Sequence, residues 1–285
     1  MKTPQLYNPL TALMGLIMVI LVGCQASQSA IRPKIVTPSN QIAGLTWWTP
    51  EPGQSWQVQY EGKIDLNRQV DIYNLDLFDT TVDDIQGLHD RGIRVICYLN
   101  AGAWENWRPD NQDFPQALLG NDYAGWSGER WLDIRKIEQL APLMTARLDL
   151  CVEKGCDGVE PDNVDSYLQP TGFNLTAADQ LKYNRWLAGE AHQRGLGVGL
   201  KNDPEQAVDL VNDFDWITTE SCFHQGWCES VQPFIQASKP VFAIEYTHET
   251  AHLTHFCVTD LGQLIQPILK HRSLDAWLET CSSNR

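Results

Sequence analysis

Short apolar runs alternate with amphipathic helical patterns along the chain from residue 43 onward. The runs predict eight strands, over residues 43–48, 70–75, 95–99, 130–134, 158–160, 197–200, 216–219 and 241–244. Between and after them, apolar spacings of three and four predict helices over 82–91, 137–153, 176–194, 205–212, 231–237 and 260–272. This order of elements is typical of an α/β protein.

Three of the predicted helices end in a cation followed by glycine: Arg91-Gly92, Lys154-Gly155 and Arg194-Gly195. A strand pattern follows each glycine, which predicts a parallel sheet, and eight strands predict closure into a (β/α)8 TIM barrel. We expect one domain over residues 41–285. An open doubly wound sheet is the alternative, but no glycine-rich phosphate motif follows the first run.

The ends of the predicted strands carry carboxylates, amides and aromatic rings, and barrel enzymes build their active sites at these ends. Aromatic rings stack on sugar faces, and carboxylates or amides bond sugar hydroxyl or amino groups, so the pattern indicates a carbohydrate cleft. The candidate sugar-binding residues are Trp48, Asp76, Tyr98, Asn100, Glu105, Asp133, Arg135, Glu160, Asn163, Lys201, Asn202, Glu245 and Tyr246. Trp131 and Trp216 lie within strand patterns and are expected in the core.

Residues 157–165 place four carboxylates within nine residues. We expect Pro161 to end the strand ladder there and the acids to project into a cleft. A solvated acidic loop or a calcium loop is the alternative. Glycosidic cleavage needs one proton donor and one carboxylate that attacks the sugar or activates water. We assign Asp162 as nucleophile or base, and Glu220 as the acid because its apolar strand should raise its pKa by burial.

The formal net charge of −15 disfavours binding to nucleic acid and favours cationic partners. At the N-terminus, Lys2, the apolar run 10–22 and Leu21-Val22-Gly23-Cys24 predict a signal peptide over residues 1–23. The last four residues resemble a bacterial lipobox, which implies lipidation of Cys24 and an exported, envelope-anchored protein. An ordinary cleaved signal or an uncleaved anchor is the alternative. Residues 24–40 read as a linker.

Export permits disulfides. We expect the pairs Cys222–Cys228, Cys151–Cys156 and Cys257–Cys281, with Cys97 free and buried in its apolar strand. The sequence contains no pair of C-x-x-C motifs, which would have indicated a structural zinc site.

Several segments together resemble one known family: 157–165 with its Glu-Pro-Asp-Asn block, 220–223, 239–246, 47–50 and 97–105. They are similar to glycoside hydrolase family 114, the endo-α-1,4-polygalactosaminidases, over residues 43–250. The resemblance implies a TIM barrel that cleaves galactosamine-rich polymers internally, with Asp162 and Glu220 as the catalytic pair and no required metal or cofactor. We expect a monomer.

Partially deacetylated galactosaminan is a polycation near neutral pH, so an acidic cleft would concentrate it. Asp76, Asp133, Glu105 and Glu245 would then bind amino groups, unless they serve as structural partners of Arg135 or Lys201.

Two other functions compete with this interpretation. His248-Glu249-Thr250-Ala251-His252 matches the zinc-peptidase pattern H-E-x-x-H, in which one helical face presents both histidines. No strong helical pattern carries the motif, which disfavours a zinc peptidase. A sugar-binding lipoprotein without catalysis is the second alternative, disfavoured by the presence of both candidate acids.

Overall fold

The computed structural model describes residues 41, 42 and 44–281. The predicted signal peptide, the Cys24 lipidation site and the linker to residue 40 lie outside the described residues. No described helix is both long enough and apolar enough to cross a membrane.

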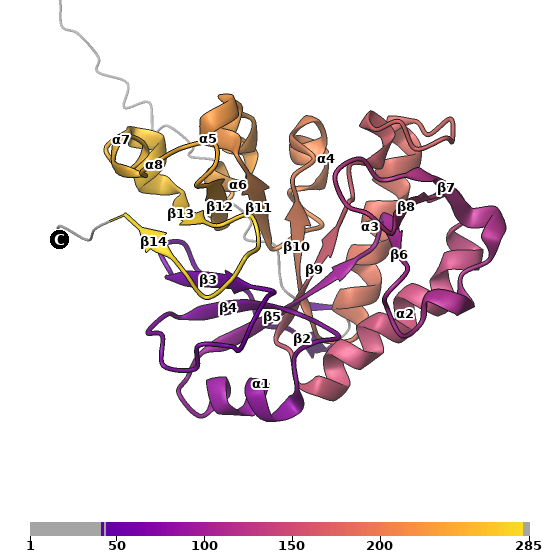
Figure 1. Cartoon of the computed structure of the whole chain (residues 1–285), viewed down its shortest axis with the longest axis horizontal. Helices are drawn as coiled ribbons and strands as arrows, with labels where there is room; N and C mark the ends of the chain where they lie inside the picture. The colour runs from indigo at the N-terminus through magenta and orange to yellow at the C-terminus, as the bar shows by residue number, and fades with distance from the viewer. Residues whose placement is uncertain (1–40, 43, 282–285) are drawn as a thin grey trace, which may run out of the picture. The chain divides into compact units, whose positions relative to one another are not determined.

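The main sheet contains eight parallel strands in the order expected of a barrel (Figure 1). They are β3 (Trp56–Gln59), β4 (Ile72–Asp76), β5 (Arg94–Asn100), β9 (Gly158–Asp162), β10 (Gly197–Lys201), β11 (Trp216–Glu220), β12 (Val241–Tyr246) and β13 (Gln266–Lys270). Each strand pairs with the next parallel strand along the chain, and the short antiparallel β14 (Glu279–Thr280) borders β13. The predicted α/β barrel architecture is confirmed.

The sheet curls so that side chains join its first and last parallel strands. The indole Nε1 of Trp56 donates to the Gln266 carbonyl at 2.9 Å, and Lys270 Nζ donates to Gln57 Oε1 at 2.8 Å. Lys270 also donates to the carbonyls of Asp275 and Trp277. These bonds satisfy a buried ammonium group, which would otherwise be costly in the interior.

Helices follow the strands, and several are short. They are α1 (Val82–His89), α2 (Ile137–Lys154), α3 (Ala177–Gln193), α4 (Ala207–Leu210), α5 (Cys222–Gln225), α6 (Gln232–Gln236), α7 (Thr254–Cys257) and α8 (Asp260–Leu264). Two of these, α5 and α7, were not predicted. Single 3-10 turns lie at η1 (Asn111–Asp113), η2 (Gln116–Leu118), η3 (Ser166–Leu168), η4 (Pro204–Gln206) and η5 (Cys228–Val231). Capping boxes at Thr81 and Thr176 start α1 and α3, and Gly155 ends α2 in a left-handed conformation.

The predicted strand over residues 43–48 and the predicted helix over residues 260–272 are wrong. Residues 43–48 contribute no barrel strand, because β2 (Leu45–Thr46) pairs with β1 (Gln41–Ile42) in a separate hairpin. The first barrel strand is β3, whose alternating glutamines look half-exposed in the sequence. In the structure Gln57 and Gln59 are buried, with their amides bonded to backbone carbonyls. The predicted helix 260–272 ends at Leu264, because Pro267 cannot continue it and β13 follows.

The predicted strand 130–134 lies in a second sheet. It forms β8 (Glu129–Leu132), which pairs antiparallel with β6 (Ala103–Glu105) and β7 (Leu119–Asp122). Figure 1 shows this small sheet as a layer separate from the main sheet. The excursion between β5 and α2 therefore adds a wall beside the barrel, and β9 pairs directly with β5.

The barrel interior is packed around Trp216, which is fully buried. Gly199 makes room for this ring, since a Cβ there would lie 2.1 Å from the indole Nε1. Trp131 is also buried, so both tryptophans expected in the core are there. A larger apolar cluster fills the space between the sheet and helices α1, α2 and α3.

Two of the three predicted disulfides are confirmed, Cys222–Cys228 and Cys257–Cys281. The third prediction is wrong: Cys97 on β5 pairs with Cys156, and Cys151 is a buried free thiol. Cys151 lies within the last turn of α2, whereas Cys156 lies beyond Gly155 and just before β9, which neighbours β5. Disulfides are typical of proteins that fold in oxidising compartments.

Candidate active site

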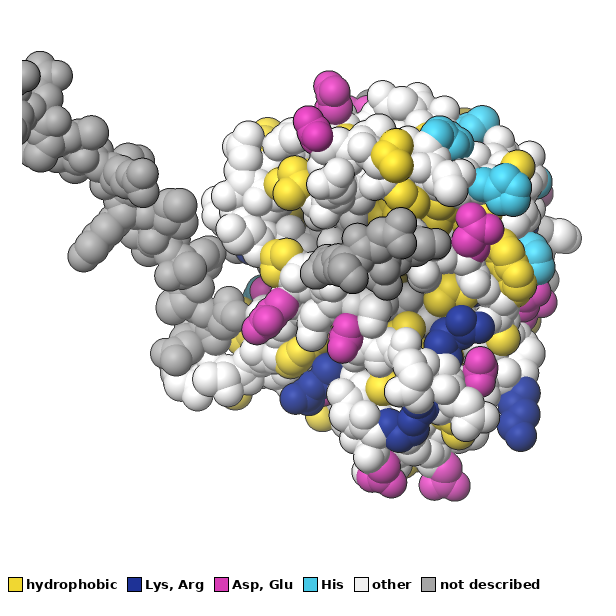
Figure 2. Space-filling view, turned by 90° about the vertical axis from the view of Figure 1, so that its left-hand side faces the viewer, with side chains coloured by type: hydrophobic (Ala, Val, Ile, Leu, Met, Phe, Trp, Pro, Cys, Tyr) yellow, Lys and Arg dark blue, Asp and Glu magenta, His cyan; other side chains and the backbone are white. Residues whose placement is uncertain are grey.

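A cleft of about 790 Å³ lies at the carboxyl ends of the parallel strands. Ten carboxylates line it: Glu61, Asp76, Asp79, Glu105, Glu129, Asp162, Asp165, Glu205, Glu220 and Glu249. Seven aromatic residues also line it: Tyr60, Tyr98, Trp107, Tyr123, Trp126, Trp227 and Tyr246. Only three cations do so, Arg108, Lys201 and Arg272. On the face shown in Figure 2, by contrast, acidic and basic side chains are interspersed.

The register of neighbouring strands places residues of the site side by side at the carboxyl end of the sheet. Asn100 on β5 pairs with Asp162 on β9, and Asp76 on β4 pairs with Tyr98 on β5. The expectation that Pro161 ends the ladder is wrong on the β5 side, where Pro161 pairs with Leu99. On the other side, the pairing of β9 with β10 ends at Val159. Proline lacks the N–H that a ladder on both sides would need.

The backbone turns sharply directly after three of these strands. Asn163, Asn202 and Ser221 follow Asp162, Lys201 and Glu220, and each has a positive φ of 53° to 60°. Left-handed conformations cost energy for residues other than glycine and cluster at functional sites. The Asp162 carbonyl accepts hydrogen bonds at 3.0 Å from the amides of Ala101 and Gly102. A Cβ on Gly102 would lie 1.7 Å from the Asn163 carbonyl oxygen, so this approach requires glycine.

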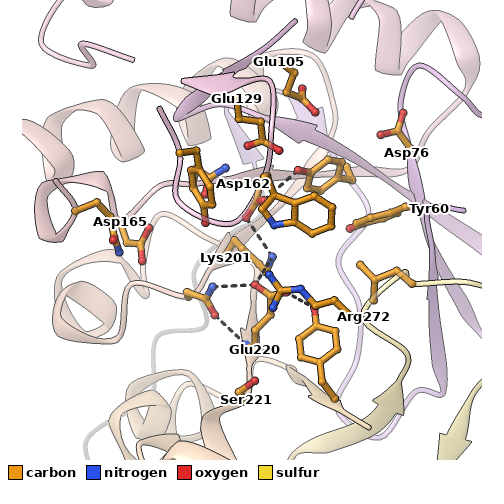
Figure 3. A pocket seen from close by; sticks show the side chains of 18 of the residues that line it. Tyr60, Asp76, Glu105, Glu129, Asp162, Asp165, Lys201, Glu220, Ser221 and Arg272 are labelled. Atoms are coloured by element: carbon orange, nitrogen blue, oxygen red, sulfur yellow. Dashed lines mark hydrogen bonds and ion pairs between the residues drawn. The ribbon is translucent and has the colours of Figure 1, made fainter. Parts of the chain in front are cut away.

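Lys201 links the two predicted catalytic carboxylates, and we call Asp162, Lys201 and Glu220 the lysine cluster (Figure 3). Lys201 Nζ lies 3.1 Å from Asp162 Oδ1 and 3.0 Å from Glu220 Oε2. The Tyr98 hydroxyl donates to Asp162 Oδ2 at 3.0 Å, and the Tyr246 hydroxyl donates to Glu220. Two predicted acids from separate strands therefore lie around one cation at the floor of the cleft.

The charges of this cluster set its protonation. Burial alone would raise the pKa of Glu220, but Lys201 and the hydrogen bonds from Tyr246, Lys201 and Asn202 together lower that pKa below its ordinary value. Burial alone would lower the pKa of Lys201, but Asp162, Glu220 and Glu160 raise it well above the ordinary value. The expectation of a raised pKa for Glu220 is wrong, because the sequence did not reveal that Lys201 lies 3.0 Å from its carboxylate.

A second acidic group, the glutamate pair of Glu105 and Glu129, lies on the small sheet. The two residues are direct cross-strand partners between β6 and β8, a position in which like charges are unfavourable. Burial, together with the charges of Glu105 and Asp162, raises the pKa of Glu129 to about 8. Glu105 is buried, and its Oε2 has no hydrogen-bond partner among the described residues, although Arg108 lies 2.9 Å from its Oε1. An unpaired buried acceptor of this kind calls for a donor that the described residues do not supply, such as a bound water or ion.

Most of the predicted sugar-binding residues line the cleft: Asp76, Tyr98, Glu105, Asn163, Lys201, Asn202 and Tyr246. Several are held by neighbours. Asp76 accepts two hydrogen bonds from Arg108, and Asn163 Nδ2 donates to Asn100 Oδ1 at 3.1 Å. Asn202 bonds both the backbone and the carboxylate of Glu220.

Six other predicted residues do not line it: Trp48, Asn100, Asp133, Arg135, Glu160 and Glu245. Trp48 lies near Gly197, where β10 begins, at the opposite end of the barrel. Asp133 and Arg135 pair with each other at 2.7 Å, so the structural alternative holds for both. Glu245 is buried and accepts hydrogen bonds from the Phe223 and His224 amides.

Asn100 and Glu160 lie beneath the cleft. Asn100 is buried, donates a hydrogen bond to Glu129 and accepts one from the Ala103 amide, so it connects β5 to strands β8 and β6 beside the cleft. Glu160 is buried inside the barrel and accepts a hydrogen bond from Thr218. Burial raises the pKa of Glu160.

Sequence reasoning missed the cleft residues that come from long excursions. Tyr60, Arg108, Tyr123, Trp126, Glu129, Trp227 and Arg272 belong to β8 or to connecting segments. Exposed tryptophans in polar loops, such as Trp107 and Trp126, were an available signal. Asp165 also lines the cleft, and burial next to Asp162 raises its pKa to about 6.

The H-E-x-x-H segment is not helical in the structure. It forms turns after β12, with Glu249 bonded to Ser221 and His252 lying 3.7 Å from Glu279. Over the described residues, the one group spaced to bind a metal is Cys97, Cys151 and Cys156, of which two form a disulfide. The geometry therefore disfavours a zinc peptidase.

The family model of glycoside-hydrolase family GH114 matches residues 37–285. The structure resembles that of Aspergillus fumigatus Ega3 in complex with galactosamine, with 36% identity and a TM-score of 0.78, covering 82% of this chain and 97% of Ega3. The glycoside hydrolase domain of PelA from Pseudomonas aeruginosa shares the fold, with 16% identity and a TM-score of 0.63, over 80% of this chain and 99% of that one.

An uncharacterized protein of Deinococcus radiodurans is 24% identical over 208 residues, which are 65% of this chain and 66% of that protein. The family model covers most of the chain, and Ega3 exceeds 30% identity over most of both chains. The chain therefore belongs to the glycoside hydrolases of family GH114.

Proposed function

We propose that this protein is an endo-acting hydrolase of α-1,4-linked, galactosamine-rich polysaccharide. One observation carries the proposal: the cleft is lined by ten carboxylates and three cations, and two of those cations are already paired with carboxylates. A polymer with free amino groups is cationic, so such a cleft attracts it. Family membership and the similarity to Ega3, whose structure contains galactosamine, support the same substrate class.

Asp162 acts as the nucleophile or base and Glu220 as the proton donor. Their attachment to β9 and β11, the strands on either side of β10, favours this use, because catalytic groups need fixed positions. Lys201 stabilises the Glu220 carboxylate that remains after the proton has passed to the leaving oxygen. Its lowered pKa makes Glu220 a stronger acid but reduces the fraction that is protonated at neutral pH.

The glutamate pair binds a sugar ammonium group. The buried Oε2 of Glu105 has no hydrogen-bond partner in the part of the chain that the structure describes, and Glu129 is mostly protonated at neutral pH because its pKa is about 8. An arriving ammonium group would supply both a hydrogen-bond donor and a positive charge, which favours the ionised form of Glu129. The exposed indoles of Trp107 and Trp126 offer stacking faces for further sugar rings.

We also propose that the protein is exported, with residues 1–23 as a signal peptide, Cys24 as a lipid anchor, 24–40 as a linker and 41–285 as the catalytic domain. The three disulfides support an oxidising compartment. We expect a monomer.

The proposed activity is tested by measuring reducing ends released from partially deacetylated galactosaminan. We expect Asp162→Asn and Glu220→Gln each to lower the rate by about 10³-fold, because each removes one of the two reacting carboxylates. Glu153→Gln on the exposed surface of α2 is the matched control and should retain the wild-type rate. A wild-type protein that binds the polymer and releases no ends would be a sugar-binding protein instead. Active variants would contradict only the residue assignment.

A further inference from the structure

Arg272 differs from the other cations of the cleft in having no carboxylate partner among the described residues. Arg108 pairs with Asp76 and Glu105, and Lys201 pairs with Asp162 and Glu220. Within residues 44–281, no carboxylate lies within ion-pair distance of Arg272. Its guanidinium carbon instead lies 5.4 Å from the Trp126 ring and 5.6 Å from the Tyr246 ring. The side chain is exposed, so its charge faces whatever enters the cleft.

Arg272 lies at the Glu220 end of the lysine cluster. Tyr246, which it contacts, donates its hydroxyl hydrogen bond to Glu220. The glutamate pair lies at the other end, where Glu129 bonds Asn100 and is influenced by the charge of Asp162. Figure 3 shows Glu105 and Glu129 beyond Asp162, and Arg272 beside Glu220. The two ends of the lysine cluster therefore differ in chemistry, with a pair of carboxyl groups beyond Asp162 and an exposed guanidinium beside Glu220.

Trp126 supplies a stacking face at the positive end. It lies in the turn between β7 and β8, is 44% exposed and lines the cleft. Sugar rings stack on such faces through their C–H groups. A galactosamine bound there would bring its ammonium group toward an unneutralised guanidinium, which repels it. An N-acetylated sugar has no charge, and its acetamide carbonyl can accept a hydrogen bond from the guanidinium.

We propose that Arg272 and Trp126 form a subsite for an N-acetylated sugar residue, next to Glu220. Together with the glutamate pair at the opposite end, this subsite selects the bond between an acetylated residue and a free-amine residue. The inference rests on the proposed function, because it concerns the substrate of that same cleft. It makes a partially acetylated polymer the substrate, in preference to a fully deacetylated or a fully acetylated one.

The test compares galactosaminans that are fully deacetylated, partially acetylated and fully acetylated, with rates from reducing ends and product termini from mass spectrometry. We expect wild type to prefer the partially acetylated polymer and to leave acetylated residues on one new end and free amines on the other. Arg272→Glu should reverse the charge at this subsite and raise kcat/KM on the fully deacetylated polymer about fivefold to tenfold. Arg272→Gln should show a smaller change in the same direction.

Arg91→Glu is the control for net charge, since Arg91 is exposed at the end of α1, remote from the cleft. Trp126→Ala should raise KM on the partially acetylated polymer more than on the fully deacetylated one. Trp126→Phe keeps an aromatic ring and should bring KM on the partially acetylated polymer close to the wild-type value. Symmetric product ends in wild type, or the same rate ratio in wild type and Arg272→Glu, would overturn the subsite while leaving the hydrolase activity intact. Failure of wild type to cleave any of the three polymers would refute the proposed function itself, and the subsite with it.

Discussion

The lysine cluster and the glutamate pair are both groups of acids at one cleft, yet their protonation differs. Glu220 is partly buried and its pKa is lowered, because Lys201 lies 3.0 Å away. Glu129 is buried opposite another glutamate, and its pKa is raised to about 8. Burial pushes the pKa of both acids upward, so the nearby charges decide the outcome. A carboxylate in a cleft cannot be assigned a role from its burial alone.

The largest effect is expected from Lys201→Met, which removes the cation and with it the difference in pKa shift between Glu220 and Glu129. Without Lys201, burial should raise the pKa of Glu220 above its ordinary value, and the two acids would repel each other. We expect the maximal rate to fall by about 10²-fold and the alkaline limb of the pH–rate profile to move to higher pH, because Glu220 keeps its proton longer. The measurement is kcat/KM on galactosaminan across pH.

Lys201→Arg retains the charge and should keep the limb near its wild-type position, while Lys63→Met on the exposed surface controls for net charge. An unchanged alkaline limb in Lys201→Met would show that Lys201 does not control Glu220.

The second prediction concerns the glutamate pair and protein stability. The folded state holds the Glu129 proton up to pH about 8, whereas the ordinary pKa of a glutamate is 4.5. The contribution of Glu129 to the free energy of unfolding is therefore full below pH 4.5 and is lost as pH rises through 8. Glu129→Gln cannot ionise and avoids that loss. We expect its free energy of unfolding to exceed that of wild type by about 1–2 kcal/mol at pH 9, and to match it near pH 4.

Denaturant unfolding at both pH values measures this difference, with Glu153→Gln as an exposed control. An equal gain for Glu129→Gln at pH 4 and pH 9 would mean that ionisation is not its cause.

The smallest expected effect comes from the two tyrosine hydroxyls of the lysine cluster. Tyr246→Phe removes a hydrogen bond to Glu220, and Tyr98→Phe removes one to Asp162. Each loss should lower the rate about threefold to tenfold, as expected for one hydrogen bond to a charged group. Only Tyr246→Phe should raise the pKa of Glu220 and shift the alkaline limb upward. A shift of the same size in Tyr98→Phe would show that the two carboxylates titrate as one unit.

The repeated strand, helix and glycine pattern was sufficient to predict the barrel class and helices α1, α2 and α3. Six barrel strands, β4, β5, β9, β10, β11 and β12, were located from their apolar runs. The first and last strands were missed because their polar residues are satisfied by contacts that form only on closure. Lys270 of β13, for example, donates to Gln57 of β3.

Residues at the strand ends could be predicted for the same reason: a parallel sheet carries successive strand ends to one edge. Local sequence was therefore enough to place Asp162, Lys201 and Glu220 at the same edge of the sheet, where the structure brings them together. Glu129 and Arg272 could not be, because an antiparallel excursion and the loop after an unpredicted strand bring them to the cleft. The Cys97–Cys156 disulfide was missed likewise, since the nearer Cys151 looked like the better partner.

Local sequence determined most of the elements and the chemical groups that stand at their ends, because periodicity and capping act over a few residues. Only the tertiary structure decided what surrounds each group, since neighbouring charges and closure contacts come from segments distant in sequence. Glu220 shows both sides of this division. Its place at a strand end follows from the apolar run before it, but its lowered pKa depends on Lys201, nineteen residues earlier and one strand away.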